Sequence, residues 1–198
     1  MPVYNCADVI LESLKSIDGK VDEIICVDGR WIGIEGADRS TDDTQKIILK
    51  FSAHSKSSVF YTLLPVMHQW EARTESLKFA ENGSWIILLD SDELVIEWGD
   101  EVRSTLENST EKTYRMCWLK YKPYAAHLRY GVLRKTETLH WGTDHRRLFD
   151  KDGEIDIPNA PIIHIVLTNH PLADKKKQRA NMQQYYKWLH DYEENQVN

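Results

Sequence analysis

The chain has 198 residues, 41% of them apolar, and a formal net charge of -6. This length suits one domain, or one domain with an appendage, that buries enough apolar surface to fold without disulfides. The acidic charge argues against a nucleic acid as the main partner. No apolar run is long enough to span a bilayer, and the first residues do not have the pattern of a signal peptide.

The three cysteines indicate a reducing compartment. Cys6, Cys26 and Cys117 lack the spacing of a metal site, and the last two lie in apolar, strand-like runs. They are typical of buried thiols. We therefore expect a cytoplasmic protein that is able to rest on a membrane surface.

The first half of the chain alternates helices and strands at short spacing. Apolar residues at positions 9, 10, 14 and 17 predict an amphipathic helix that closes at Asp18-Gly19. A strand over 21–28 ends in Asp28, and after a polar loop over 29–40 we expect a helix over 44–51 and a strand over 58–64. This alternation is typical of βαβ units, so it predicts an α/β protein with a mostly parallel sheet flanked by helices.

The most informative stretch surrounds an apolar run over 85–89. We expect a helix before it to end at Asn82-Gly83, where glycine provides a left-handed cap. The run itself predicts a short strand that is buried on both faces of the parallel sheet. Asp90, Ser91 and Asp92 follow at the carboxyl end of this strand, where open α/β sheets bind ligands. Two carboxylates there repel each other unless a cation joins them, and oxygen ligands suit Mg²⁺ or Mn²⁺.

The same D-x-D spacing occurs a second time in the chain, at Asp150-Lys151-Asp152. This copy lies beside Gly153 in a polar, turn-like stretch, so we interpret it as a solvated loop. Only the first copy follows an apolar strand. Its alternative interpretation is a turn or a helix N-cap made by Asp90 or Asp92.

The second half predicts a mixed sheet built onto the parallel half. A helix is expected over 100–108, and strands over 113–121, 146–149 and 162–166. A final helix over 174–192 begins with basic residues. It either packs on the domain or lies in a membrane interface.

Several of these segments occur in the order of a known family. Pro2-Val3-Tyr4-Asn5 opens the chain, and D-E-I-I-C-V-D over 22–28 is followed by D-R-S-T-D-D-T over 38–44. Glu71-Ala72-Arg73, W-I-I-L-L-D-S-D over 85–92, H-R-R-L-F over 145–149 and His164 come next. Together these segments resemble the family 2 glycosyltransferases, which have the GT-A fold. The likeness is strong over 2–93 and patchy to about 170.

The resemblance implies how the chain is divided. A GT-A-like, Rossmann-like domain would occupy 1–170, with a nucleotide-sugar-binding half over 1–93 and a mixed-sheet acceptor half over 94–170. Residues 171–198 would form a C-terminal helical appendage. Three positions depart from the family: Met1 stands where a full first strand is usual, so the pocket is expected to lack a wall; 29–37 looks like an insertion; and Thr74 replaces an Asn.

The resemblance also implies a site for a UDP- or GDP-sugar. Asp28 would accept hydrogen bonds from the base, unless it only caps a loop. Pro2 and Tyr4 would flank the base, although Tyr4 is equally compatible with the core. Arg73 would reach the diphosphate or hold Asp90 through an ion pair, and as a lone residue it would be a solvated helix charge.

A divalent ion, Mn²⁺ or Mg²⁺, is implied beside the sugar nucleotide. Asp90 would contact the ribose or position the metal, Ser91 would lie against the donor, and Asp92 would bind the metal directly. His164 would complete the metal shell, because a neutral imidazole binds Mn²⁺. Its alternative is a satisfied histidine in the core.

The implied reaction is the transfer of a sugar to an acceptor hydroxyl of a glycan or lipid-linked acceptor, with inversion by analogy to the family. Asp144 is the candidate general base, and a salt bridge to Arg146 or Arg147 is its alternative. His140 and His145 are in reserve. The rival functions are a degenerate relative that binds nucleotide-sugar or glycan without transfer, and a nucleotidyltransferase. A nucleotidyltransferase usually has a glycine-rich phosphate loop after its first strand, and this sequence has none.

Overall fold

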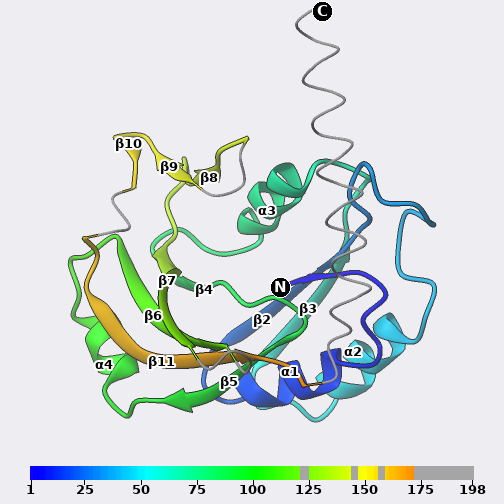
Figure 1. Ribbon diagram of the computed structural model, residues 1–198, viewed down its shortest axis with the longest axis horizontal. Coiled ribbons are helices and arrows are strands. Elements are labelled where there is room, and N and C mark those ends of the chain that lie inside the picture. Colours follow the sequence, from blue (N-terminus) through cyan, green and yellow to red (C-terminus); the bar gives the residue numbers. More distant parts are fainter. Residues whose placement is uncertain (121–124, 144–146, 156–158, 172–198) are drawn as a thin grey trace, which may run out of the picture.

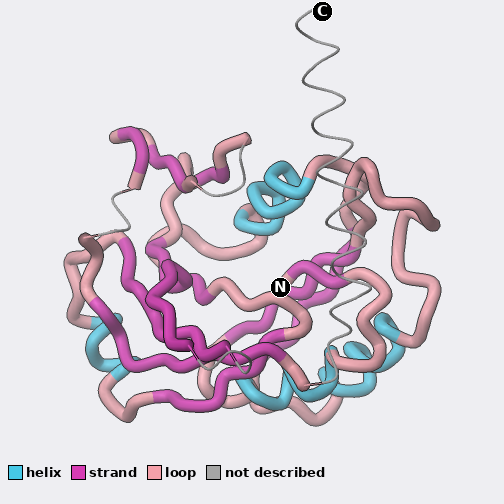
Figure 2. The backbone as a smooth tube through the Cα atoms, viewed as in Figure 1, coloured by secondary structure: helices cyan, strands magenta, loops and turns pink. Residues whose placement is uncertain are grey.

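The computed structural model describes residues 1–120, 125–143, 147–155 and 159–171, and these form the α/β fold that the sequence predicts. The expected C-terminal helix over 174–192 lies outside the described residues. Within them, no helix is long and apolar enough to cross a membrane. Figure 2 shows helices on two sides of a central layer of strands.

The first half forms a parallel sheet with strand order β1-β2-β3. Its strands are β1 (Pro2–Val3), β2 (Glu23–Asp28) and β3 (Ser58–Leu63). Helices α1 (Ile10–Ile17) and α2 (Thr44–Ser52) connect them and lie together beside the strands, with α3 (Gln69–Leu77) on the other side (Figure 1). The apolar face of α1 is fully buried, which confirms the predicted amphipathic helix. This half therefore follows the sequence pattern closely.

Helix α3 ends earlier than the sequence predicts. Its last buried side chain is Leu77, and residues 81–84 are exposed, so no apolar face remains to hold a further turn. Gly83 has a positive φ of 88° but lies in a separate turn, where its N–H donates to the carbonyl of Lys135. The start of helix α3 is fixed by a capping box between His68 and Glu71.

The strand after α3 is not the buried parallel strand that we expected. It is β4 (Trp85–Ile87), it is half-buried, and it pairs antiparallel with β7 (Ala125–Arg134). Strand β7 itself was not predicted. The five-stranded mixed sheet has the order β4-β7-β6-β11-β5, where β5 is Glu93–Trp98, β6 is Thr113–Lys120 and β11 is Ile162–Asn169. The prediction was wrong because the partner of β4 comes from a distant part of the chain rather than from the parallel half.

The remaining elements are small. Helix α4 (Val102–Glu107) confirms the predicted helix, and β8 (His140–Trp141), β9 (Leu148–Asp150) and β10 (Gly153–Glu154) form an antiparallel sheet. One apolar core joins the two halves, because side chains of α1, α2, β2, β5, β6 and β11 all contribute to it. The mixed sheet is thereby fixed against the helices of the parallel half.

Candidate functional site

The carboxylate of Asp28 organises the end of the parallel sheet. Its side chain is only 1% exposed, and its oxygens accept hydrogen bonds from the backbone N–H of Ser40 (3.1 Å), the Ser40 hydroxyl (2.9 Å) and the Tyr61 hydroxyl (2.8 Å). Burial, followed by this contact with Asp28, raises the pKa of Tyr61. Asp28 therefore holds the loop before α2 as a cap does, and a base could reach its oxygens only if Ser40 or Tyr61 moved.

The opening segment is bound to the same loop. The Asn5 N–H donates to the Ser40 hydroxyl (2.8 Å), and the Asn5 side-chain oxygen accepts from the Thr41 N–H (2.8 Å). Asn5 has a positive φ of 47°, which Asn tolerates better than most residues. The next residue, Cys6, donates its N–H to the Thr44 hydroxyl at 2.9 Å. The motifs at 2–5 and 38–44 thus form one hydrogen-bonded unit.

The extra loop over 29–37 covers this unit. Its middle pairs with the segment before α3, where the Ile32 N–H donates to the Met67 carbonyl at 2.9 Å. The Tyr4 hydroxyl donates to the carbonyl of Ala37 (2.9 Å) and would clash with a Cβ on Gly36. Tyr4 is half-buried, so it is neither plain core nor fully open to a ligand. Pro2 lies just before it in β1.

The first D-x-D turn is held by an ion pair. Arg73 on α3 places Nη2 3.2 Å from Oδ1 of Asp90, and its guanidinium lies over the ring of Trp141 at 5.2 Å. The Asp90 side chain is 39% exposed, whereas that of Arg73 is 19% exposed. Of the three interpretations of Arg73, the structure supports the one in which it holds Asp90, and its low exposure argues against a solvated helix charge. The Thr74 hydroxyl accepts the N–H of Trp141 (3.0 Å), which ties α3 to β8.

The other two residues of this turn face different neighbours. Burial raises the pKa of the Cys6 thiol to about 11 and Ser91 opposes this effect, so the turn lies beside the opening segment. Asp92 lies against the end of β11, where the Asn169 amide donates to its carboxylate (3.4 Å) and the His170 N–H donates to its carbonyl (2.7 Å). The alternative interpretation, a plain turn, is also partly realised, because the Glu93 carboxylate accepts the Asp90 N–H at 3.0 Å.

His164 does not join this site, so that prediction is wrong. Its ring lies 3.2 Å from Glu97 and 3.8 Å from Glu101, and it is 54% exposed. Strand β11 pairs Ile165 with Trp98 but Asn169 with Glu93, so His164 lies at the far end of the strand from Asp92. The offset from Asn169 is roughly 16 Å at the usual rise of a strand. The histidine beside Asp92 is instead His170, which is buried.

The candidate base, Asp144, lies outside the described residues, as do His145 and Arg146. His140 is described, but its Nδ1 contacts the carbonyl of Thr138 and its ring stacks on Phe149. It is an exposed residue of the small antiparallel sheet. Of the three candidates for the general base, only His140 lies in the part of the chain that the structure describes.

Sequence reasoning missed two members of the site. Tyr61 reaches Asp28 because β2 and β3 are parallel and pair Cys26 with Tyr61. Asp28 and Tyr61 both lie near the carboxyl ends of predicted strands, and the sequence alone could have indicated that they meet at one edge of the parallel sheet. Asn169 was harder to find, since its contact with Asp92 depends on the register of β5 against β11.

The donor atoms at the turn fit a divalent ion only in part. Among the residues that the structure describes, no group of three His, Cys, Asp or Glu side chains is arranged to hold a metal. Asp90 and Asp92 supply two partly exposed carboxylates. Such a pair fits Mg²⁺ or a similar ion that takes its other ligands from water and from a bound diphosphate.

The geometry agrees with a comparison against protein families. The profile described as "Glycosyl transferase family 2" matches residues 1–98, which include Asp28, Arg73 and the Asp90–Asp92 turn. The N-terminal half of this chain belongs to that family. Family membership and the parallel sheet confirm the predicted GT-A-like α/β fold class.

Comparison with solved structures finds similarity to S. aureus TarS. The crystal structure of TarS 1-349 in complex with UDP has 20% sequence identity and a TM-score of 0.49, over 63% of this chain and 36% of that chain. The complex of TarS 1-349 with UDP-GlcNAc has 20% sequence identity and a TM-score of 0.48, over 63% of this chain and 34% of that chain. The chain thus spans about a third of the length of these TarS structures. A search of curated proteins gives no match.

Proposed function

We propose that this family 2 glycosyltransferase moves a sugar from a nucleoside-diphosphate sugar to an acceptor hydroxyl with the help of Mn²⁺ or Mg²⁺. One observation carries the proposal: the three motifs meet. Asn5 binds the loop that Asp28 holds. Pro2, from the same opening segment, lines one cleft with Arg73 and Asp90. A nucleotide end and a diphosphate end are therefore adjacent.

Each end has a chemical role in the proposal. The loop over 38–44 and Tyr4 form the nucleoside end, where aromatic surface and backbone groups contact the base. Arg73 and the D-x-D turn form the diphosphate end. Arg73 holds Asp90 in place through their ion pair, and its guanidinium adds positive charge next to the position of the phosphates.

The leaving nucleoside diphosphate gains negative charge as the bond between its phosphate oxygen and the anomeric carbon of the sugar breaks. Asp92 and Asp90 would hold a divalent ion there, which would stabilise this charge without a proton. Asp92 is fixed from behind by Asn169 and His170, so its carboxylate is oriented before the donor arrives. Asp144 remains the proposed general base, with inversion at the anomeric carbon and a glycan or lipid-linked acceptor in the cytoplasm.

The test is a panel of UDP- and GDP-sugars incubated with the protein, each with Mn²⁺ and with a chelator. We expect release of nucleoside diphosphate from one donor, only in the presence of the ion, and faster release when an acceptor is added. Release of pyrophosphate from a nucleoside triphosphate would instead show a nucleotidyltransferase.

The variant Asp144→Asn separates transfer from binding alone. The proposal predicts donor binding close to wild type in this variant, with turnover reduced about 10²- to 10⁴-fold, the usual contribution of a general base. Donor binding without turnover in the wild-type protein would show the degenerate, binding-only relative and would overturn the proposal.

A further inference from the structure

Strand β3 forms an open edge of the parallel sheet, because the order β1-β2-β3 leaves one of its sides without a neighbouring strand. The Ser58 N–H donates to the Asp22 carbonyl (2.9 Å) and the Leu64 N–H donates to the Asp28 carbonyl (2.8 Å). Along a strand the backbone groups alternate in direction, so those of every second residue from 58 to 64 face β2. Within the described residues, no hydrogen bond reaches the outward N–H and C=O groups between them. These outward groups belong to Val59, Tyr61 and Leu63.

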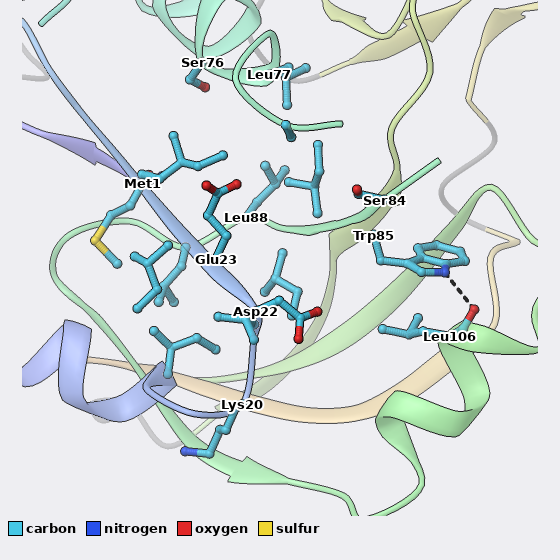
Figure 3. A pocket seen from close by; sticks show the side chains of 18 of the residues that line it. Met1, Lys20, Asp22, Glu23, Ser76, Leu77, Ser84, Trp85, Leu88 and Leu106 are labelled. Carbon is cyan, nitrogen blue, oxygen red and sulfur yellow. Dashed lines mark hydrogen bonds between the residues drawn. The ribbon is translucent and has the colours of Figure 1, made fainter. Parts of the chain in front are cut away.

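The other edge strands of the two main sheets differ from β3. Residues of β1 and β4 line a cleft of about 580 Å³ inside the molecule, whose lining includes Met1, Trp85 and Leu88 (Figure 3). Strand β5 carries the exposed Glu97, and its pairing with β11 contains a register shift. Charges and irregularities of this kind keep an edge strand from pairing with another chain. Strand β3 has no such protection, because residues 57–67 contain no charged side chain.

Apolar side chains lie next to this open edge. Phe60 is 40% exposed and Leu63 is 45% exposed, although both are large apolar residues. The ring of Phe60 lies 5.3 Å from that of Phe79, which follows α3 and is itself 38% exposed. Unpaired strand backbone beside exposed aromatic surface is a template on which another strand can pair.

The pattern of β3 is complementary to itself. In an antiparallel pair of two copies centred on Tyr61, this residue would face the partner subunit's Tyr61. Val59 would face the partner subunit's Leu63, so all the outward backbone groups would meet in hydrogen-bonded positions. Phe60 would face the partner subunit's Thr62, and pairs of an aromatic and a β-branched residue stabilise sheets. Because the whole stretch is uncharged, no like charges would meet near the axis.

We propose that β3 is a dimerisation edge, on which a second copy of this chain pairs antiparallel about a two-fold axis at Tyr61. The parallel sheets of the two subunits would then join into one sheet, with the order β1-β2-β3-β3-β2-β1. A two-fold contact uses the same surface on both subunits, so it closes at the dimer and forms no longer chain. The Tyr61 hydroxyl donates to Asp28 (2.8 Å), so the axis would lie beside the nucleoside end of the site.

Sedimentation equilibrium of the wild-type protein over a range of concentrations is the first test. The paired edge is short, so we expect a weak, reversible dimer that is half-formed at about 100 µM protein or below. A protein that is still monomeric at about 1 mM would overturn the proposal. Growth beyond the dimer would also overturn it, because the two-fold contact is closed.

Matched variants locate the contact. Leu63→Lys puts a charge on the pairing edge and is expected to weaken the dimer about tenfold or more. Ile96→Lys makes the same kind of change on β5, at a residue that is 47% exposed, and should leave the dimer unchanged. Leu63→Pro removes an outward N–H that β2 does not use, so it should keep the fold and weaken the dimer. Circular dichroism checks that each variant is folded, and equal effects at Leu63 and Ile96 would overturn the proposal.

Hydrogen exchange of the wild-type protein needs no variant and reads the geometry directly. At a concentration about tenfold above that of half-dimerisation, exchange at Val59, Tyr61 and Leu63 should be about fivefold slower than in the dilute protein. The amides of Phe60 and Thr62 already face β2 and should change little. Slowing that does not alternate along β3, or that occurs on another element instead, would overturn the proposal. These readouts do not involve nucleotide or turnover, so they stand or fall separately from the proposed function.

Discussion

The chain contains one spacing in two environments, and the difference between them is instructive. In the first D-x-D, Asp90 and Asp92 are partly exposed and face Arg73 and Asn169. In the second, the Asp150 side chain is 4% exposed and accepts hydrogen bonds from the hydroxyls of Thr136 (2.8 Å) and Thr138. The expectation of a solvated loop was wrong for Asp150 and correct for the exposed Asp152.

Asp150 has a structural role. The hydroxyls of Thr138 and Thr136 hold its pKa at about 2, well below the ordinary value, and the Lys151 N–H adds a further bond. Lys112 lies 3.9 Å from Asp150 and 2.7 Å from Asp152. Oδ1 of Asp150 accepts all three of these hydrogen bonds and so holds β9 to the loop that contains Thr136 and Thr138, whereas the first copy keeps carboxylate surface for a ligand.

The largest difference between the two copies is expected when the first copy, the Asp90–Asp92 turn, loses a charge. Asp92→Asn is expected to lower donor turnover about 10²- to 10³-fold, as loss of a preorganised electrostatic group does. Asp152→Asn, at the matched position of the second copy, should leave turnover at the wild-type level. Steady-state release of nucleoside diphosphate measures both, and similar losses in the two variants would remove the distinction.

The structural copy should respond in stability instead. Asp150→Asn replaces a charged acceptor of several hydrogen bonds and is expected to lower the free energy of unfolding by about 2–3 kcal/mol. Urea denaturation followed by circular dichroism measures the change. Donor affinity at a temperature where the variant is folded should remain within a factor of two, and a large loss of affinity would place Asp150 in the site.

The structural role of Asp150 also predicts how stability depends on pH. The pKa of Asp150 is about 2 in the folded protein, against about 3.9 for an unfolded chain. Its depressed value contributes stability above the unfolded pKa, and this contribution is lost as the pH falls from about 4 toward 2. The stability difference between wild type and Asp150→Asn should therefore shrink over that window. A difference that grows instead would contradict the assignment.

The smallest effect is expected at His164. Because this side chain contacts Glu97 and Glu101 at the far end of β11, His164→Ala should change Mn²⁺-dependent turnover by less than a factor of two. An initial-rate titration with Mn²⁺ tests this. A clear increase in the Mn²⁺ concentration needed for half activity would show that His164 does reach the metal.

Local pattern was sufficient where neighbours in sequence are neighbours in space. The apolar face of α1 and the strand that ends in Asp28 follow directly from residue spacing, and so does the position of the D-x-D turn after an apolar strand. The turn after β4 was placed correctly although the partner of that strand was not.

Long-range register was beyond reach of the sequence. Whether His164 or Asn169 meets Asp92 depends on how β11 slides against β5, and a strand offers no local mark of register. The burial of Asp150 depends on Thr136 and Thr138, which lie in an earlier loop. A turn signal such as Gly153 describes the backbone but not which hydroxyl groups gather around it.

The central claim is that the Asp90–Asp92 turn binds a divalent ion together with a nucleoside diphosphate. Isothermal titration calorimetry with UDP and with GDP, each with and without Mn²⁺, tests it most directly on wild type, Asp92→Asn and Asp152→Asn. We predict Mn²⁺-dependent binding of one nucleotide by wild type and Asp152→Asn, and affinity at least about tenfold weaker in Asp92→Asn. Binding that is unchanged by Mn²⁺, or equal in all three proteins, would contradict the claim.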